Sequence, residues 1–304
     1  MCRGIFLVGW IVATLVVPVK AVIVAGADGT INTSAPTDDP GWANVGSSGV
    51  YIGNYGGGFW VLTATHVGAG SITFSSGTYT AVGGSSIIVR NGNNSTTDLT
   101  LFRISSDPGL PSLTLSSSAP AVGTSVTTIG NGVNRGTSQL YWDVNQNGNP
   151  SGSTSGAAWT WTQLPDATGA EASGYAWGSG SAKQYGTNNI DGTASYDIGN
   201  GNTTSLYADF DAVTGESQGA SGDSGGAVFV KNGGAWELVG IMGAIGTFNN
   251  QPGSHAIFGN VTYYASVPAY YSYITTAIPE PADVALWAAA IAAGFTIWWR
   301  RRRE

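Results

Sequence analysis

Short apolar or alternating runs recur along the middle of this 304-residue chain, and Gly, Asn, Ser or Pro residues separate nearly all of them. Examples are "GFWVLTATHV" (58–67), "LTLFRIS" (99–105), "TSVTTIG" (124–130) and "ELVGIMGAIG" (237–246). Runs rich in β-branched and aromatic residues, bounded by turn residues, are typical of β-strands. The pattern therefore predicts an all-β body built as antiparallel barrels or sandwiches. The segment 105–123 contains three prolines and is a candidate connector between two β halves.

Composition and charge narrow the function classes. Only 10% of residues are charged and 46 are Gly, which disfavours long helices, while 42% hydrophobic residues and 11 Trp suffice for a core. Between residues 22 and 277, five basic residues stand against fifteen acidic ones, a net charge near −10. Such a body repels phosphate, so a nucleic-acid partner is excluded. The only cysteine, Cys2, precedes the expected processing site, so the mature body should contain neither a disulfide nor a thiolate metal site.

The first residues have the layout of a secretory signal peptide. Arg3 precedes an apolar stretch at 5–17, and small residues follow it. Cleavage after Ala21 is preferred because that residue lies closer to the apolar run, and cleavage after Ala27 is the alternative. A retained membrane helix is the other interpretation, but about thirteen apolar residues are short for a span. We therefore predict a signal peptide at residues 1–21.

The last residues predict a sorting segment at 278–304. Residues 282–299 carry one charge and as a helix would extend about 27 Å, close to the hydrocarbon thickness of a bilayer. The following run, Arg300–Arg303, should stay cytoplasmic. The order Pro279-Glu280-Pro281, apolar run and Arg cluster closely resembles the PEP-CTERM sorting signal of bacterial exosortase systems. This resemblance implies an outer-membrane bacterium and removal of the tail after export, and an ordinary tail anchor is the alternative.

Three candidate catalytic residues lie in separate β-rich segments. His66 follows an apolar run in "WVLTATH", Asp98 precedes an alternating run in "DLTLFRI", and Ser224 lies in "GDSGGAVF". A strand that ends on a histidine delivers the imidazole to the rim of a barrel. Each residue alone also has a structural interpretation: a bystander at the rim, a turn or cap residue, and a serine in a Gly-rich loop.

Together, in the order His, Asp, Ser, these segments resemble the chymotrypsin/trypsin-like serine protease family over roughly residues 45–250. The resemblance implies two antiparallel six-stranded-type β-barrels packed with a cleft between them. It also implies that Ser224 attacks the peptide carbonyl and that His66 acts as general base and then as general acid. Asp98 would fix the tautomer of His66 and stabilise its imidazolium form. The first spacing, 32 residues, is somewhat short for the family, and the second, 126 residues, is within its range.

The same resemblance assigns roles around the nucleophile. The backbone N–H groups of Gly222 and Ser224 would form the oxyanion hole. Asp223 would pair with an α-amino group that activation releases. The segment "VIVAG" after Ala21 loosely resembles the mature start of family members, so export cleavage there would free that amino group at Val22. A mature start at Asp28 would exclude this role.

The expected substrate pocket departs from the family pattern. Gln218, six residues before Ser224, stands where the family sets primary specificity, and it is neither a carboxylate nor an apolar residue. Met242, Gly243 and Ala244 lie where a strand should bind the substrate backbone. Gly243 replaces the serine that usually supports the catalytic aspartate, and the disulfides of the family are absent.

The segment 131–210 is rich in Gly, Asn and Trp and exceeds what a minimal barrel needs. We expect an elaborated loop over the groove. Its tryptophans favour burial in a β core, and binding of polysaccharide faces is the alternative.

These inferences predict an exported, surface-sorted serine endopeptidase with its protease domain at 22–277. We expect it in the cell envelope or outside the cell, transiently anchored by the C-terminal helix. No cofactor or metal is expected, because no phosphate-binding motif or metal-ligand spacing occurs. Expected partners are a protein or peptide substrate, the export and exosortase-type sorting machinery, and the membrane. Two alternatives keep the fold: a non-catalytic surface adhesion or matrix-binding protein, and a serine esterase.

Overall fold

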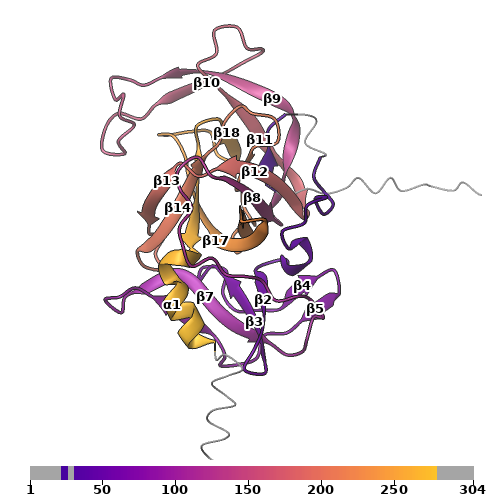
Figure 1. Ribbon diagram of the computed structural model, residues 1–304. Helices are drawn as coiled ribbons and strands as arrows, with labels where there is room; N and C mark the ends of the chain where they lie inside the picture. The colour runs from indigo at the N-terminus through magenta and orange to yellow at the C-terminus, as the bar shows by residue number, and fades with distance from the viewer. Residues whose placement is uncertain (1–21, 27–30, 279–304) are drawn as a thin grey trace, which may run out of the picture.

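The computed structural model describes residues 22–26 and 31–278, in which strands predominate, as the sequence predicts (Figure 1). The predicted signal peptide and the sorting segment from residue 279 onward lie outside the described residues and remain predictions. Within the described ranges, no helix has both the length and the apolar character needed to span a membrane. Segment 105–123 joins the last strand of the N-terminal half to the first strand of the C-terminal half.

The N-terminal half contains six strands in two hydrogen-bonded groups. Its four-stranded antiparallel sheet has the order β2 (Val50–Tyr55), β3 (Gly58–Thr63), β7 (Thr96–Ile104) and β6 (Ile87–Arg90). A hairpin of β4 (Ile72–Phe74) and β5 (Gly77–Tyr79) accompanies it. This half therefore has the number of strands that the resemblance implies for one barrel, arranged as a sheet and a hairpin.

The C-terminal half differs from the prediction, because its main sheet has seven strands. The order is β12 (Gln184–Asn189), β8 (Ser125–Gly130), β16 (Ala227–Asn232), β17 (Ala235–Gly246), β19 (Val261–Ser266), β14 (Thr203–Asp209) and β13 (Gly192–Tyr196). The two edge strands, β12 and β13, come from a polar Gly/Asn-rich stretch that lacks apolar alternation. They form because the backbone of each pairs with the free edge of a neighbouring strand.

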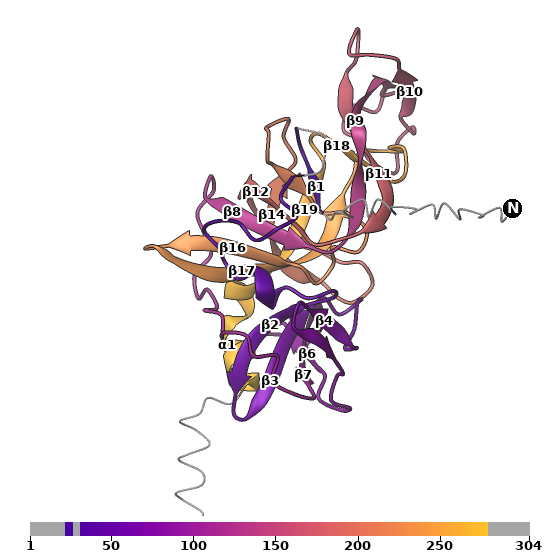
Figure 2. The same cartoon turned by 90° about the vertical axis from the view of Figure 1, so that its right-hand side faces the viewer.

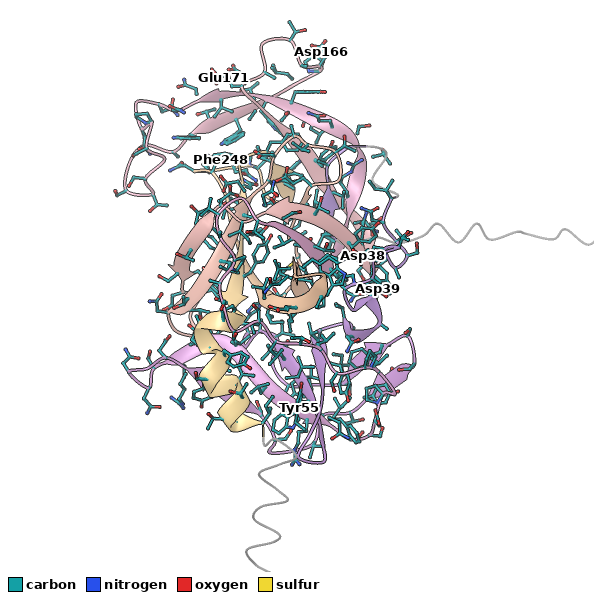
Figure 3. The ribbon with its side chains drawn as sticks, in the orientation of Figure 1. Asp38, Asp39, Tyr55, Asp166, Glu171 and Phe248 are labelled. Carbon is teal, nitrogen blue, oxygen red and sulfur yellow. The ribbon has the colours of Figure 1, made fainter. Side chains whose placement is uncertain are left out.

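A second sheet extends from the end of the molecule opposite the N-terminal half (Figure 2). Its order is β10 (Thr160–Leu164), β9 (Val133–Asn145), β11 (Ala172–Ser181) and β18 (His255–Ile257). The segment 131–210 is thus largely strands rather than the expected loop. Trp142 and Trp159 are 2% and 8% exposed, as a core role predicts. Phe248, which stacks on Trp159 at 6.0 Å between ring centroids, lies beneath this sheet in Figure 3.

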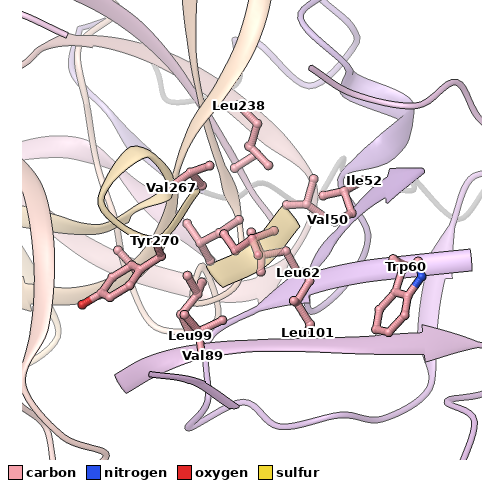
Figure 4. Close-up of a cluster of buried hydrophobic side chains, with 14 of the residues drawn as sticks. Val50, Ile52, Trp60, Leu62, Val89, Leu99, Leu101, Leu238, Val267 and Tyr270 are labelled. Atoms are coloured by element: carbon pink, nitrogen blue, oxygen red, sulfur yellow. The ribbon is translucent and has the colours of Figure 1, made fainter. Parts of the chain in front are cut away.

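One apolar cluster crosses both halves of the molecule (Figure 4). It joins Leu62 and Leu101 of the N-terminal sheet to Leu238 of β17 and to a helix, α1 (Val267–Ala277). This helix is not among the predicted elements. Its N-cap, Ser266, accepts a hydrogen bond from a backbone N–H in the first turn, and a proline occupies that turn. Because α1 packs on both halves, it fixes the sheets that carry the candidate catalytic residues relative to one another.

Candidate active site

Antiparallel register brings His66 and Asp98 together. Thr63 at the end of β3 pairs with Thr100 of β7. Continuing this register by two residues places residue 65 opposite Asp98, with His66 next to it. His66 Nδ1 lies 2.9 Å from each carboxylate oxygen of Asp98, and the His66 backbone N–H donates to Oδ1 at 2.9 Å. Asp98 is the third residue of β7, slightly inside the strand that it was expected to precede.

The Asp98 carboxylate is fully buried and has further donors. The Tyr196 hydroxyl donates to Oδ2 at 3.1 Å, and the Asn200 amide donates to Oδ1 at 3.4 Å. The Asp98 side chain is 0% exposed, whereas that of His66 is 28% exposed. A buried carboxylate with several donors holds the imidazole in one orientation, and part of the ring remains accessible.

The turn that carries Ser224 lies against the end of β3. A Cβ on Gly225 would lie 2.7 Å from the Ser48 carbonyl oxygen and 2.7 Å from Thr63 Oγ1, so only glycine fits there. Its φ of +85° imposes the same restriction. The residue after Ser224 is therefore in contact with the strand end that leads to His66.

Only some backbone N–H groups in this turn donate a hydrogen bond. The N–H groups of Asp223 and Gly225 donate to the carbonyls of Ala220 and Met242 at 3.1 and 2.8 Å. Among the described residues, the N–H groups of Ser221, Gly222 and Ser224 donate to no acceptor. The two N–H groups that the resemblance assigns to the oxyanion hole, those of Gly222 and Ser224, are therefore free to donate to a ligand.

Ser224 lines a cavity of about 140 Å³. Met242, Gly243 and Ala244 of β17 also line it, and Trp177 and Thr262 add to its wall. β17 contains a register shift between Met242 and Ala244, which leaves Gly243 outside the regular pairing with β19. Serine, strand and cavity therefore form one continuous site.

The sequence of residues 47–241 matches the family described as trypsin-like peptidase domain, and this match covers more than half of the chain and includes His66, Asp98 and Ser224. The chain belongs to this family. Its predominantly β, chymotrypsin-like fold, which the sequence predicts, is therefore confirmed, and the family is one of serine protease-type hydrolases.

Two solved structures resemble this trypsin-like peptidase distantly, in fold alone. One is an inactive mutant form of Rv3671c from M. tuberculosis H37Rv, with 14% identity, coverage of 85% of this chain and 98% of that chain, and a TM-score of 0.42. The other is the NS6 protease from murine norovirus 1, with 16% identity, coverage of 77% and 93%, and a TM-score of 0.38. No curated protein matches the chain.

Asp223 of the peptidase is buried beside the start of the described chain. Its Oδ1 accepts the backbone N–H of Val22 at 3.4 Å and that of Gly132 at 2.7 Å, and its Oδ2 accepts that of Ala220 at 2.8 Å. Burial raises the pKa of Asp223 to about 7, although these backbone donors oppose the shift. Val22 is 0% exposed, and its backbone nitrogen is one of the donors to this buried carboxyl group.

Gln218 is placed differently from the expectation. β15 (Ser217–Gln218) pairs with β1 (Ile23–Val24), and Gln218 faces Ile23 in this pair. That packing leaves Gln218 1% exposed and outside the residues that line the cavity around Ser224. Its two amide atoms have no hydrogen-bond partner among the described residues.

Sequence reasoning missed the polar residues behind Asp98. Tyr196 and Asn200 come from the β13–β14 hairpin, and the Thr203 hydroxyl there accepts the Asp98 backbone N–H at 2.7 Å. The stretch "SYDIGNGNTT" has the appearance of an ordinary polar turn. No periodic or motif signal in it indicates contact with a residue about a hundred positions earlier.

Proposed function

We propose that this trypsin-like peptidase is a serine endopeptidase whose catalytic triad is His66, Asp98 and Ser224. The observation that carries the proposal is the His66 Nδ1 atom at 2.9 Å from both oxygens of the fully buried Asp98. The family match and the Ser224 turn against the end of β3 support the same assignment.

The proposed reaction proceeds through an acyl-enzyme. Ser224 Oγ forms a bond to the peptide carbonyl carbon while His66 Nε2 takes the hydroxyl proton. The carbonyl oxygen becomes an anion that the N–H groups of Gly222 and Ser224 stabilise. The carbon–nitrogen bond then breaks, and His66 gives its proton to the leaving amine. Water repeats the sequence on the ester and regenerates the Ser224 hydroxyl.

A serine-reactive phosphonate tests the nucleophile without knowledge of the substrate. The native protein is expected to form one covalent phosphonyl adduct at Ser224, because only a hydroxyl beside a general base is activated. Intact-mass spectrometry followed by peptide mapping locates the adduct. The urea-unfolded protein and the Ser224→Ala variant are matched controls and should remain unlabelled. A folded native protein that acquires no label would favour the non-catalytic adhesion alternative.

Comparison of peptide and ester substrates addresses the esterase alternative. The proposal expects turnover of members of a peptide library, whereas hydrolysis restricted to activated esters would favour an esterase. The library also reports specificity, which the buried neutral Gln218 leaves open.

We further propose that the chain is exported and sorted at the cell surface, and that cleavage after Ala21 activates it. The sequence layout of the two ends supports export and sorting, and the Val22 nitrogen beside Asp223 supports activation. N-terminal sequencing of the mature protein is expected to find Val22. A mature start at Asp28 would remove the activation role.

The pH dependence of stability tests the Val22–Asp223 pair. Burial raises the pKa of Asp223, so the folded, uncut chain binds a proton at this carboxyl more tightly than the unfolded chain does. The protonated carboxyl therefore contributes its full share to the free energy of unfolding below about pH 4, and this contribution is lost as pH rises through about 7. An ammonium group at Val22 would offset that loss. In a Ser224→Ala background, the uncut chain should lose up to about 4 kcal/mol of unfolding free energy between these limits, relative to Asp223→Asn. A chain that starts at Val22 should lose much less in urea titrations, and equal losses would contradict the proposed pair.

A further inference from the structure

At position 243, members of the family usually carry a serine that supports the catalytic aspartate. In this chain the residue is Gly243, and the side chain of Tyr196, from another strand, fills the space. A Cβ on Gly243 would overlap the Tyr196 hydroxyl and would lie 2.6 Å from Tyr196 Cζ. The same Cβ would lie 3.3 Å from Oδ2 of Asp98. Position 243 therefore faces the catalytic carboxylate, and the absence of a side chain there admits the tyrosine.

Tyr196 makes the contact that a serine at position 243 would make. Its hydroxyl donates to Oδ2 of Asp98 at 3.1 Å, and the residue is 7% exposed. Apart from His66, it is the only donor to that oxygen among the described residues, because the Asn200 amide and the His66 N–H reach Oδ1. Burial and the neighbouring Asp98 carboxylate raise the pKa of Tyr196 well above its ordinary value, so the hydroxyl keeps the proton that it donates.

The β13–β14 hairpin holds Tyr196 in this place. Tyr196 pairs with Thr203, whose hydroxyl accepts the Asp98 backbone N–H at 2.7 Å. The hairpin packs closely on the start of β7, because a Cβ on Gly201 would overlap the carbonyl oxygen of Thr96. The tyrosine ring also packs against Tyr263 at 5.9 Å between centroids. The hydroxyl is thus preorganised by backbone pairing and ring packing.

We propose that Tyr196 is a positioning residue of the catalytic triad, and that Gly243 and Tyr196 act as a coupled pair that replaces the usual serine hydroxyl. Tyr196 acts through Asp98, whose carboxylate it orients toward His66, and it does not touch the substrate. This inference rests on the proposed function, and it goes beyond it by assigning a residue outside the triad.

Tyr196→Phe is the first test, because it removes the hydroxyl and keeps the ring. We expect kcat for a peptide substrate to fall about 10- to 100-fold, the range for losing a hydrogen bond to a charged group, with KM within about twofold. Tyr207→Phe is the matched control. Tyr207 also packs its ring on Tyr263, at 6.3 Å, but it lies outside the proposed machinery. That control should keep the kcat of the unmodified enzyme.

Moving the hydroxyl between strands is the second test. Tyr196→Ala is expected to lose at least as much kcat as Tyr196→Phe, and adding Gly243→Ser to it should restore most of the loss. Gly243→Ser alone should lower the melting temperature, because Tyr196 already fills the space. A structural role of Tyr196 alone would not produce rescue by a smaller side chain from another strand.

The Nδ1 proton of His66 gives a spectroscopic readout. The chain has two histidines, so its proton resonance can be assigned by comparison with a His255→Gln variant. Tyr196→Phe should shift this resonance, and Tyr207→Phe should not. If the unmodified enzyme is active, and the Tyr196→Phe variant keeps full kcat and an unshifted His66 resonance, the role proposed for Tyr196 is wrong and the proposed function still stands. An unmodified enzyme that neither turns over peptides nor accepts the phosphonate would overturn the proposed function with it.

Discussion

Replacing Ser224 with alanine is expected to lower kcat for peptide hydrolysis about 10⁶-fold, because the acyl-enzyme route requires the hydroxyl oxygen. Residual catalysis above water should come from substrate binding and from the N–H groups of Gly222 and residue 224, which the substitution leaves in place. The variant should fold normally, since Ser224 is only partly buried and the turn is held by Asp223 and Gly225 backbone bonds.

The decisive measurement is single-turnover hydrolysis of a library-derived peptide, with circular dichroism to verify folding. Ser138→Ala, an exposed substitution of the same kind on β9, is the matched control and should keep full activity. Normal turnover by folded Ser224→Ala would exclude Ser224 as the nucleophile. A comparable loss in Ser138→Ala would indicate a general effect of serine removal rather than a catalytic one.

The parts of this site that the sequence predicts are those held by local pattern. The apolar run before His66 and the alternating run after Asp98 are adjacent strands, and their register alone brings the two side chains into contact. The glycines beside Ser224 are also predictable from the sequence. At Gly225, a positive φ and the close approach of neighbouring atoms exclude any residue with a side chain. Local rules suffice because each of these residues is placed by its own strand or turn.

The parts that escape prediction depend on long-range contacts. β12 and β13 form because a free sheet edge accepts their backbones, and this pairing leaves no apolar alternation in the sequence. Tyr196 contacts Asp98 only because Gly243, on a third strand, leaves space for it. The sequence of α1 contains an N-cap residue, Ser266, and buried residues at helical spacing. The aromatic run before it is typical of a strand, so the start of the helix is not evident from the sequence.

Replacing Asp98 with asparagine is expected to lower kcat about 10⁴-fold with little change in KM, because it disturbs the tautomer of His66 rather than substrate binding. The carboxylate accepts the His66 backbone N–H at Oδ1 and the Tyr196 hydroxyl at Oδ2. The asparagine amide has one acceptor oxygen and one donor nitrogen, which carries two hydrogens. The backbone N–H cannot become an acceptor, whereas the Tyr196 hydroxyl can rotate to accept, so the amide nitrogen should occupy the Oδ2 position.

In that orientation one amide hydrogen points to the Tyr196 oxygen and the other faces His66 Nδ1, which lies 2.9 Å from the Oδ2 position. Nδ1 is equally close to the Oδ1 position, but the amide oxygen there already accepts from the His66 backbone N–H and the Asn200 amide. The imidazole would then accept at Nδ1 and carry its proton on Nε2, where it can no longer take the proton of Ser224. Nitrogen-15 spectra of His66 should therefore show the Nε2-protonated tautomer in Asp98→Asn and the Nδ1-protonated tautomer in the unmodified enzyme. Asp166→Asn, an exposed substitution in the loop between β10 and β11 (Figure 3), should change neither kcat nor the spectrum. A kcat for Asp98→Asn within about tenfold of the unmodified enzyme would mean that Asp98 does not set the tautomer, and the triad assignment would fail at this residue.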